Sequence, residues 1–205
     1  MDRFNAVEDF YREQLSRYSP EDIRSMGWDD TVEYALRFKL ACEVGVLSGC
    51  SILDIGCGTG GLLSYLKSSQ EQVQYTGVDI LPEMVSICQK NHPDARVLCA
   101  NILKDDIERA DYVFCIGSLN IEEPGFHETF LLMVDAMIGL AGTGVVLNFL
   151  SDMTFLVPGK YHIESSAFVK KYVEEKFASV VDRVVIHDEE QLRGECTMFI
   201  YLKDT

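Results

Sequence analysis

The sequence predicts an α/β fold: a mostly parallel sheet with helices on both faces, preceded by a helical cap. From residue 51 onward, short apolar runs alternate with helix-length segments, which is typical of parallel strands joined by crossover helices. The last two apolar runs have no helical segment between them, so we expect an antiparallel hairpin at one edge of the sheet. The segments before residue 48 have helical periodicity, which predicts a cap at residues 1–48 and a core at residues 49–205.

The cap is expected to contain three helices. Apolar residues recur at helical spacing within residues 4–17. A short helix is expected to start at Ser19, whose hydroxyl can cap it, with Pro20 in the first turn. A third helix is expected at residues 30–47, because one apolar stripe runs along it and Gly49 follows its end.

Strands and helices alternate through the core. We expect strands at residues 51–55, 73–79, 95–99, 111–117, 143–149, 179–187 and 195–203. We expect helices at residues 60–69, 82–91, 125–141 and 164–177. Sheets of this kind bind their ligands at the carboxyl ends of the strands, so the loops at that edge are the first place to look for a site.

The composition narrows the possible partners. A chain of 205 residues is long enough for one sizeable core. Acidic residues outnumber basic ones by 33 to 18, the net charge is −15, and the basic residues do not form a patch. Nucleic acids are polyanions, so an acidic chain without a basic patch is not expected to bind them. We therefore expect a small-molecule substrate, no nucleic-acid partner, and a monomer or homodimer.

The cysteines and the apolar runs indicate where the protein works. The seven cysteines are odd in number and include no CxxC pair, which favours buried, reduced thiols over disulfides or a zinc site. We expect no metal. The first ten residues lack the apolar core of a signal peptide, and no uncharged apolar run reaches the roughly 18 residues of a membrane span. A cytoplasmic protein without a membrane partner is the prediction.

The stretch SILDIGCGTG at residues 51–60 predicts a ligand-binding turn. An apolar strand ends near Asp54, and three glycines follow at alternate positions, namely Gly56, Gly58 and Gly60. Glycines let the chain turn sharply and let a ligand lie against the backbone. The helix that follows directs its free N–H groups and its dipole toward that ligand.

A second acid supports a nucleoside ligand. Asp79 ends the next expected strand and lies 21 residues after Gly58, the spacing at which an acid can accept hydrogen bonds from both ribose hydroxyls. A dinucleotide is the main alternative, because Gly56, Gly58 and Gly61 also satisfy GxGxxG. Asp54 argues against a dinucleotide, since its charge would face a pyrophosphate but suits the ammonium group of an amino acid. The chain is also too short for a separate substrate domain.

Three stretches resemble the successive motifs of class I S-adenosylmethionine-dependent methyltransferases. They are LDIGCGTGGLLSYL at residues 53–66, YTGVDI at 75–80 and ADYVFCIGSLN at 110–120. The resemblance covers residues 30–205 approximately. It implies a Rossmann-like sheet of seven strands with the last one antiparallel, S-adenosylmethionine as the cofactor, and in-line transfer of a methyl group to a small-molecule acceptor.

The resemblance also implies a cofactor site, residue by residue. Asp54 and the loop Gly56–Gly60 would hold the methionine moiety, Arg37 its carboxylate, and Asp79 the ribose hydroxyls. The implied site contains Arg37, Asp54, Gly56, Cys57, Gly58, Thr59, Gly60, Asp79, Ile80, Leu81, Asn101, Ile102, Ile116, Gly117 and Ser118.

The remaining members of that set divide between the two ends of the cofactor. Ile80, Leu81, Asn101 and Ile102 would surround the adenine, and Ile116, Gly117 and Ser118 would face the sulfonium and the acceptor. Asn101 stands where family members often have Asp, although an amide can still hydrogen-bond the adenine amino group. Asn101 could equally cap the polar segment that follows it.

No general base stands out, and the catalytic residues stay unknown. The candidates are His127, His162 and Tyr161. A methyltransferase can lack a catalytic dyad because its cofactor already carries an activated methyl group. The segment LSDMTFLVPGKYHI at residues 150–163 is expected to cover the pocket and carry specificity, for which Met153, Phe155 and Pro158 are candidates.

The sequence also leaves open the role of its tryptophan and two functions other than methyl transfer. Trp28 is the sole tryptophan, and we expect it to anchor the cap by packing rather than to form a substrate wall. An NAD- or NADP-dependent oxidoreductase could use the same glycine loop. A non-catalytic protein that senses S-adenosylmethionine would also carry this loop. Ligand binding separates the first alternative from a methyltransferase, and turnover of an acceptor separates the second.

Overall fold

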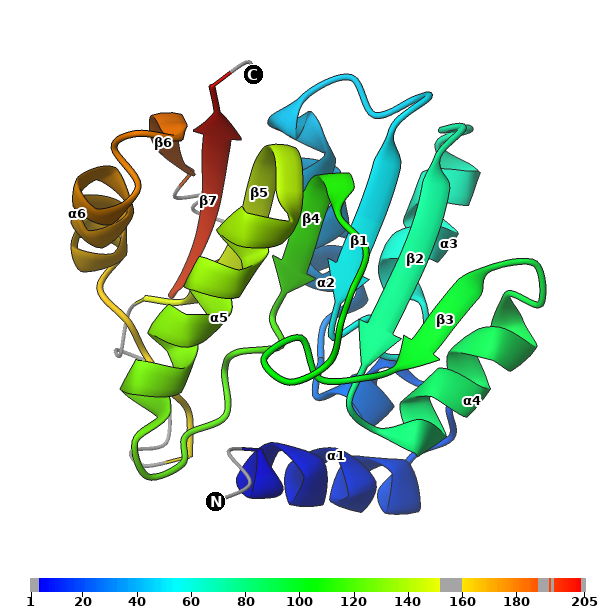
Figure 1. The fold of residues 1–205 in the computed structure, drawn as a ribbon. Helices are drawn as coiled ribbons and strands as arrows, with labels where there is room; N and C mark the ends of the chain where they lie inside the picture. Colours follow the sequence, from blue (N-terminus) through cyan, green and yellow to red (C-terminus); the bar gives the residue numbers. More distant parts are fainter. Residues whose placement is uncertain (1–3, 152–159, 188–191, 193, 204–205) are drawn as a thin grey trace.

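A computed structural model describes residues 4–151, 160–187, 192 and 194–203. Its centre is a seven-stranded sheet with the order β3-β2-β1-β4-β5-β7-β6 (Figure 1). The strands are β1 (Ser51–Ile55), β2 (Gln74–Asp79), β3 (Arg96–Cys99), β4 (Ala110–Ile116), β5 (Ala141–Leu150), β6 (Val181–His187) and β7 (Glu195–Leu202). The first five are paired in parallel, and β7 runs antiparallel to both β5 and β6. The predicted parallel sheet and C-terminal hairpin are confirmed.

The helices pack on both faces of the sheet. They are α1 (Asn5–Arg17), α2 (Thr31–Ala41), α3 (Gly61–Ser68), α4 (Pro82–Asn91), α5 (Phe126–Leu140) and α6 (Ser166–Lys176), with short 3-10 helices at Ile23–Met26 and Cys42–Val44. The apolar side chains of α5 and α6 share one core with Leu53 and Val113. Those of α2 and α3 share a second core with Ile52 and Phe114. Neighbouring residues of β1 thus face opposite cores, as strand geometry requires.

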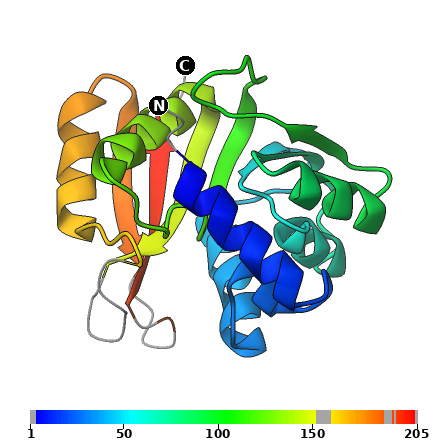
Figure 2. The ribbon, with the colours of Figure 1, turned by 90° about the horizontal axis from the view of Figure 1, so that it is seen from below.

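Helix α1 lies across the carboxyl edge of the sheet. Strands β1, β2 and β4 point toward it (Figure 1), and the view from below shows it crossing in front of that edge (Figure 2). In parallel sheets, ligands bind at the carboxyl ends of the strands and the loops that follow them. In this protein the N-terminal helix covers that edge.

Two predicted helices of the cap differ in the structure. The helical turn expected to start at Ser19 instead spans Ile23–Met26, because the Asp22 carboxylate caps it by accepting the Arg24 N–H at 2.9 Å. The helix expected at residues 30–47 is regular only to Ala41 and continues as the 3-10 turn Cys42–Val44. The chain then passes so close to the sheet that a Cβ on Gly45 would lie 2.8 Å from the Tyr112 hydroxyl.

Three further expectations concern membrane spans, the division into cap and core, and the segment expected to carry specificity. None of the helices in the described part of the chain is long and apolar enough to cross a membrane. The division into a cap of residues 1–48 and a core of residues 49–205 stays a prediction. Met153, Phe155 and Pro158, the specificity candidates, lie outside the described residues.

Candidate functional site

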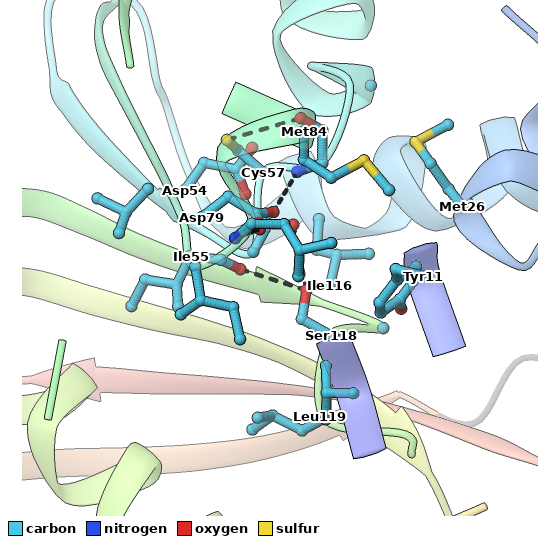
Figure 3. A pocket seen from close by; sticks show the side chains of 18 of the residues that line it. Tyr11, Met26, Asp54, Ile55, Cys57, Asp79, Met84, Ile116, Ser118 and Leu119 are labelled. Atoms are coloured by element: carbon cyan, nitrogen blue, oxygen red, sulfur yellow. Dashed lines mark hydrogen bonds between the residues drawn. The ribbon is translucent and has the colours of Figure 1, made fainter. Parts of the chain in front are cut away.

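A deep cavity lies between the carboxyl edge of the sheet and the N-terminal helices (Figure 3). It holds about 950 Å³ of space, including its opening to solvent. Most of the predicted site residues line it: Asp54, Gly56, Cys57, Gly58, Asp79, Ile80, Leu81, Asn101, Ile102, Ile116, Gly117 and Ser118. The tertiary structure thus brings the ends of four parallel strands to one cavity.

The glycine loop after β1 has a backbone that side chains would obstruct. Gly56, Gly58 and Gly60 have φ values of +71°, +53° and +91°, in the region that favours glycine. A Cβ on Gly56 would lie 2.1 Å from the Ser118 hydroxyl oxygen, and one on Gly60 would lie 2.6 Å from the His92 ring. The loop is bare because the chain turns left-handedly and packs closely against β4 and α4.

Helix α4 holds the loop from behind. The Asn91 amide donates to the Thr59 carbonyl at 3.1 Å, and the His92 Nε2 lies 3.2 Å from the Gly60 carbonyl. The Ser64 hydroxyl is also 3.1 Å from that imidazole nitrogen. Thr59 and Gly60 do not line the cavity, and these contacts turn their carbonyls toward α4. Both residues would support the loop rather than touch a ligand.

Asp79 joins the end of β2 to the glycine loop. One carboxylate oxygen accepts the Gly58 N–H at 2.9 Å (Figure 3), and the other accepts the Leu81 N–H at the same distance. The residue is 8% exposed, and burial raises the pKa of its carboxyl group. Each oxygen keeps a second lone pair, so the fixed carboxylate can still accept two hydroxyl groups of a ligand.

Asp54 is the second buried carboxylate of the cavity. It is 3% exposed and accepts the Tyr75 hydroxyl at 2.6 Å. Burial raises the pKa of Asp54 to about 7, despite that hydrogen bond. A cationic ligand group beside Asp54 would offset the cost of keeping this carboxylate ionised.

At the adenine end of the predicted site, Asn101 is part of a turn. Its side-chain oxygen accepts the Leu103 N–H at 2.9 Å, and its own N–H donates to Asp105 at 2.7 Å. Asn101 also lines the cavity, so capping and ligand contact are compatible: the amide oxygen has a second lone pair.

At the end of β4 the chain packs tightly against both the loop and the cap. The Ser118 hydroxyl donates to the Gly56 carbonyl at 3.2 Å. Gly117 has φ +70°, and a Cβ there would lie 2.4 Å from the Trp28 ring. Trp28 also lines the cavity, and its expected role as a packing anchor stays a prediction.

Arg37 does not line the cavity. It is 5% exposed, and its guanidinium forms a bidentate ion pair with Glu195 of β7, with Nε 2.8 Å from one carboxylate oxygen and 3.0 Å from the other. The guanidinium also lies 4.0 Å from the centre of the Trp28 ring. A role for Arg37 in binding a methionine carboxylate would require Arg37 to leave this partner.

The three candidates for a general base lie elsewhere. His162 is buried against the Phe126 ring and bonds Glu122 through Nδ1 at 2.8 Å. His127 is half exposed and bonds Glu164 at 2.6 Å. Tyr161 forms a β-bridge with residue 121. None of the three belongs to the described lining of the cavity, so we assign them no catalytic role.

Helix α1 and Phe4, the residue just before it, supply side chains that the sequence did not indicate as functional. Phe4, Val7 and Tyr11 all line the cavity, and their i, i+3, i+7 spacing places them on one face. The periodicity that predicted the helix was the available signal, but it does not say what the apolar face covers. Burial and the charge of Asp79 raise the pKa of Tyr11, so its hydroxyl stays neutral.

The cavity as a whole is apolar with negative charges. In the lining that the structure describes, the ionisable side chains are the carboxylates Asp54 and Asp79, one thiol and the phenols Tyr11 and Tyr34, with no Lys, Arg or His. The site can therefore hold a ligand with hydroxyl and ammonium groups, but it offers no cation for a phosphate or pyrophosphate.

Comparison with known proteins supports the same interpretation. Residues 52–136 match a sequence family described as a methyltransferase domain. The chain is 46% identical over 57 residues to the phthiotriol/phenolphthiotriol dimycocerosates methyltransferase of Mycobacterium leprae, which covers 28% of this chain and 21% of that protein. It is 30% identical over 93 residues to a putative methyltransferase of Mycobacterium tuberculosis, covering 44% and 54%. The chain thus spans about half or less of these curated relatives.

A solved structure extends the likeness over the whole chain. The magnesium protoporphyrin IX methyltransferase of Synechocystis PCC 6803 with bound S-adenosylmethionine matches with a TM-score of 0.72 and 17% identity, covering 99% of this chain and 98% of that one. At this identity the likeness concerns the fold. Residues 52–136 are thus similar to a methyltransferase domain, and the fold of the whole chain is that of the S-adenosylmethionine-bound Synechocystis enzyme.

Proposed function

We propose that this protein binds S-adenosylmethionine in the described cavity and transfers its methyl group to a small-molecule acceptor. The observation that carries the proposal is the bond from the Gly58 N–H to the Asp79 carboxylate, which fixes an acid beside a bare glycine loop. A nucleoside needs both parts: an acceptor pair for its hydroxyl groups and a backbone that its substituents can approach.

The two carboxylates suit the two ends of the cofactor. Asp79 would accept the ribose hydroxyls, and Asp54 would face the ammonium group of the methionine moiety. A pyrophosphate would meet Asp54 without any Lys or Arg in the described lining to offset the repulsion, which disfavours the oxidoreductase alternative.

The chain's own residues would mainly orient the reactants and exclude water. S-adenosylmethionine supplies the activated methyl group, so the protein needs no strong base if the acceptor is already nucleophilic. Asp79 and the glycine loop hold the nucleoside in place. The apolar face of α1 covers the carboxyl edge, where water would otherwise compete with the acceptor.

The acceptor is proposed to be a small molecule. The net charge of −15 and the cavity without cations in its described lining both disfavour nucleic acid. The names of the relatives, a phthiotriol/phenolphthiotriol dimycocerosates methyltransferase and a protoporphyrin methyltransferase, also denote acceptors that are not nucleic acids. A cytoplasmic location and a monomeric or homodimeric state remain proposals from the sequence.

Calorimetric binding tests the proposal. We expect S-adenosylmethionine and S-adenosylhomocysteine to bind, and NAD and NADP not to bind. At 100 times its dissociation constant, a ligand stabilises the fold by about 2.7 kcal/mol, so a thermal-shift assay gives an independent readout. Binding of NAD in place of S-adenosylhomocysteine would reject the proposal in favour of the oxidoreductase.

A matched pair of variants tests the residue that carries the proposal. Asp79→Ala should weaken S-adenosylhomocysteine binding by about 100-fold, since buried hydrogen bonds to a charged group contribute roughly 1.5–3 kcal/mol each. Asp182→Ala removes an exposed carboxylate on the edge strand β6 and should leave the affinity unchanged. Equal affinities for the two variants would contradict the ribose assignment.

A further inference from the structure

The Trp28 side chain lines the cavity next to Gly117. Its ring is part of the cavity lining and packs so closely against Gly117 that a Cβ on this glycine would lie 2.4 Å from the ring. Gly117 follows β4, whereas the proposed ribose and adenine contacts Asp79 and Asn101 follow β2 and β3. Because the sheet order is β3-β2-β1-β4, Trp28 lies beside the end of β4, two strands away from the end of β2 that carries Asp79.

The position of Trp28 is fixed from behind by a buried polar chain. The Arg37 guanidinium lies 4.0 Å from the centre of the ring, and Glu195 holds that guanidinium by a bidentate ion pair. Glu195 in turn accepts the Asn148 amide of β5 at 3.1 Å, and the same amide is 3.1 Å from the Thr197 hydroxyl. An aromatic residue that only packs against the cap would not need four buried polar partners behind it.

The position of Arg37 also affects which chemical groups can bind favourably to the Trp28 ring. The Arg37 guanidinium lies over the Trp28 ring but does not line the cavity, so the cavity meets a part of the ring that Arg37 leaves uncovered. A cation draws the π-electron density of an indole toward itself, which leaves the other face less attractive to a second cation. Stacking with a flat, uncharged ring remains favourable.

The charges around the cavity disfavour acceptors that carry an anionic group. The described lining contains two carboxylates and no basic side chain, so an anionic group on the acceptor would find no cationic side chain to pair with. The Tyr34 ring, whose centre lies 6.3 Å from that of Trp28, also lines the cavity and is uncharged.

We propose that Trp28 is a wall of the methyl-acceptor subsite, selecting flat aromatic acceptors without an anionic group, and that Arg37 is a positioning residue that holds the ring. This inference rests on the proposed function and names the acceptor class for the same cavity. It assigns Arg37 to Trp28 instead of to the cofactor carboxylate.

The test uses protein saturated with S-adenosylhomocysteine and two probes that share one ring system, 2-naphthol and 2-naphthoate. We expect 2-naphthol to bind at least about tenfold more tightly than 2-naphthoate by calorimetry, a difference of roughly 1.4 kcal/mol. Trp28→Leu should weaken 2-naphthol binding by about tenfold and keep the affinity for S-adenosylhomocysteine within about threefold. Phe168→Leu, at an exposed aromatic residue of α6, is the control and should change neither affinity.

The possible outcomes distinguish a failure of the acceptor-site inference from a failure of the proposed function. Failure of the wild-type protein to bind S-adenosylhomocysteine would reject the proposed function. Normal binding of that ligand with no binding of 2-naphthol, or with a preference for 2-naphthoate, would reject only the acceptor class. Loss of S-adenosylhomocysteine affinity in Trp28→Leu would place Trp28 at the cofactor and overturn its assignment to the acceptor.

A second variant tests the positioning role of Arg37. Trp28 is the only tryptophan, so its fluorescence reports on this position alone. Arg37→Met should increase quenching of that fluorescence by acrylamide and weaken 2-naphthol binding about fivefold, with little change in S-adenosylhomocysteine affinity. Arg37→Lys should recover only part of the 2-naphthol affinity, because Lys lacks the planar group that stacks and bonds in two directions.

The control for Arg37 is another arginine that stacks on an aromatic ring. Arg24 lies 4.6 Å from the centre of the Tyr18 ring and pairs with Asp22 at the surface, so Arg24→Met removes the same kind of contact at a residue that does not line the cavity. It should leave 2-naphthol binding unchanged. A selective loss of S-adenosylhomocysteine affinity in Arg37→Met would instead assign Arg37 to the cofactor.

Discussion

Asp54 is buried at the end of β1, and burial raises the pKa of its carboxyl group to about 7. In the ligand-free protein this group is therefore largely protonated at about pH 6 and largely ionised at about pH 8. Only the ionised form attracts the ammonium group of a bound S-adenosylhomocysteine molecule. The affinity for this ligand should rise by about tenfold between pH 6 and pH 8.

Calorimetry across this pH range measures the effect, and Asp54→Asn should abolish the slope while lowering the affinity at the alkaline end. Burial lowers the pKa of the nearby His92 imidazole, so this ring loses its proton at a lower pH than an exposed imidazole does. A slope that persists in Asp54→Asn would assign the titration to a different group.

The same pKa shift predicts how stability depends on pH without ligand. Because the folded-state pKa of Asp54 exceeds its unfolded value, the folded state binds more protons between about pH 4 and pH 7, and stability falls as the pH rises through that window. Asp54→Asn removes this cost, so its melting temperature at pH 8 without ligand should exceed that of the wild type by at least about 3 °C. Calorimetric scans at about pH 5 and pH 8 decide the sign, and a lower melting temperature for the variant at the higher pH would contradict it.

For single residues, the sequence predicted the location of the side chains at the edge of the sheet but not always their hydrogen-bond partners. Asp54 and Asp79 end apolar strands, and that position alone predicted their edge location. The Gly58 N–H that fixes Asp79 lies on a different loop, so only the folded chain identifies that bond. The same holds for Arg37, whose partner Glu195 is 158 residues away.

Among the elements, the turn from β1 into α3 depends on two separate properties of Gly56. Its φ of +71° disfavours any side chain, and a Cβ would lie 2.5 Å from the Ser118 Cβ. Gly56→Ala should destabilise the protein by about 1–3 kcal/mol and reduce S-adenosylhomocysteine binding below detection. Urea unfolding and calorimetry measure the two effects.

Gly49 provides a control that separates strain from crowding. Its φ is +91°, but a Cβ there would have no heavy atom within 4 Å. Gly49→Ala should cost only the conformational part, about 1 kcal/mol, and keep normal ligand binding. If the two variants lose the same stability and both bind the ligand, the packing of Ser118 against the loop is not important.

The strands were the most predictable elements, because alternation of apolar runs and helical segments extends along the core. Expected strand 143–149 is longer at both ends, as Ala141–Leu150, since pairing with β4 and β7 continues past its apolar run. The end of α2 was less predictable. It depends on how closely Gly45 approaches Tyr112 of β4, a contact that no local pattern encodes.

Across the whole molecule, the ion pair of Arg37 and Glu195 joins α2 to the C-terminal hairpin. Both side chains are 5% exposed. Removal of one partner leaves an uncompensated buried charge, so Arg37→Met or Glu195→Leu alone should destabilise the fold by about 3–5 kcal/mol. The double variant should recover most of that loss, because neither charge remains.

Urea unfolding of the two single variants and the double variant gives the coupling energy directly. Simple addition of the two losses in the double variant would mean that the pair does not connect the N-terminal helices to the sheet energetically. The pair of Arg12 with Glu83 is exposed to solvent, so its removal should have a much smaller effect on stability than removal of the buried pair.

The order of strands and helices, the glycine turn and the two acids at strand ends all follow from the sequence alone, because periodicity and backbone freedom are local properties. What covers that edge of the sheet was set by tertiary packing: α1 lies over the cavity, Trp28 lines it beside the end of β4, and Arg37 is committed to Glu195. Burial and pairing between distant segments depend on how the helices dock on the sheet, and the chain's local patterns do not encode that docking.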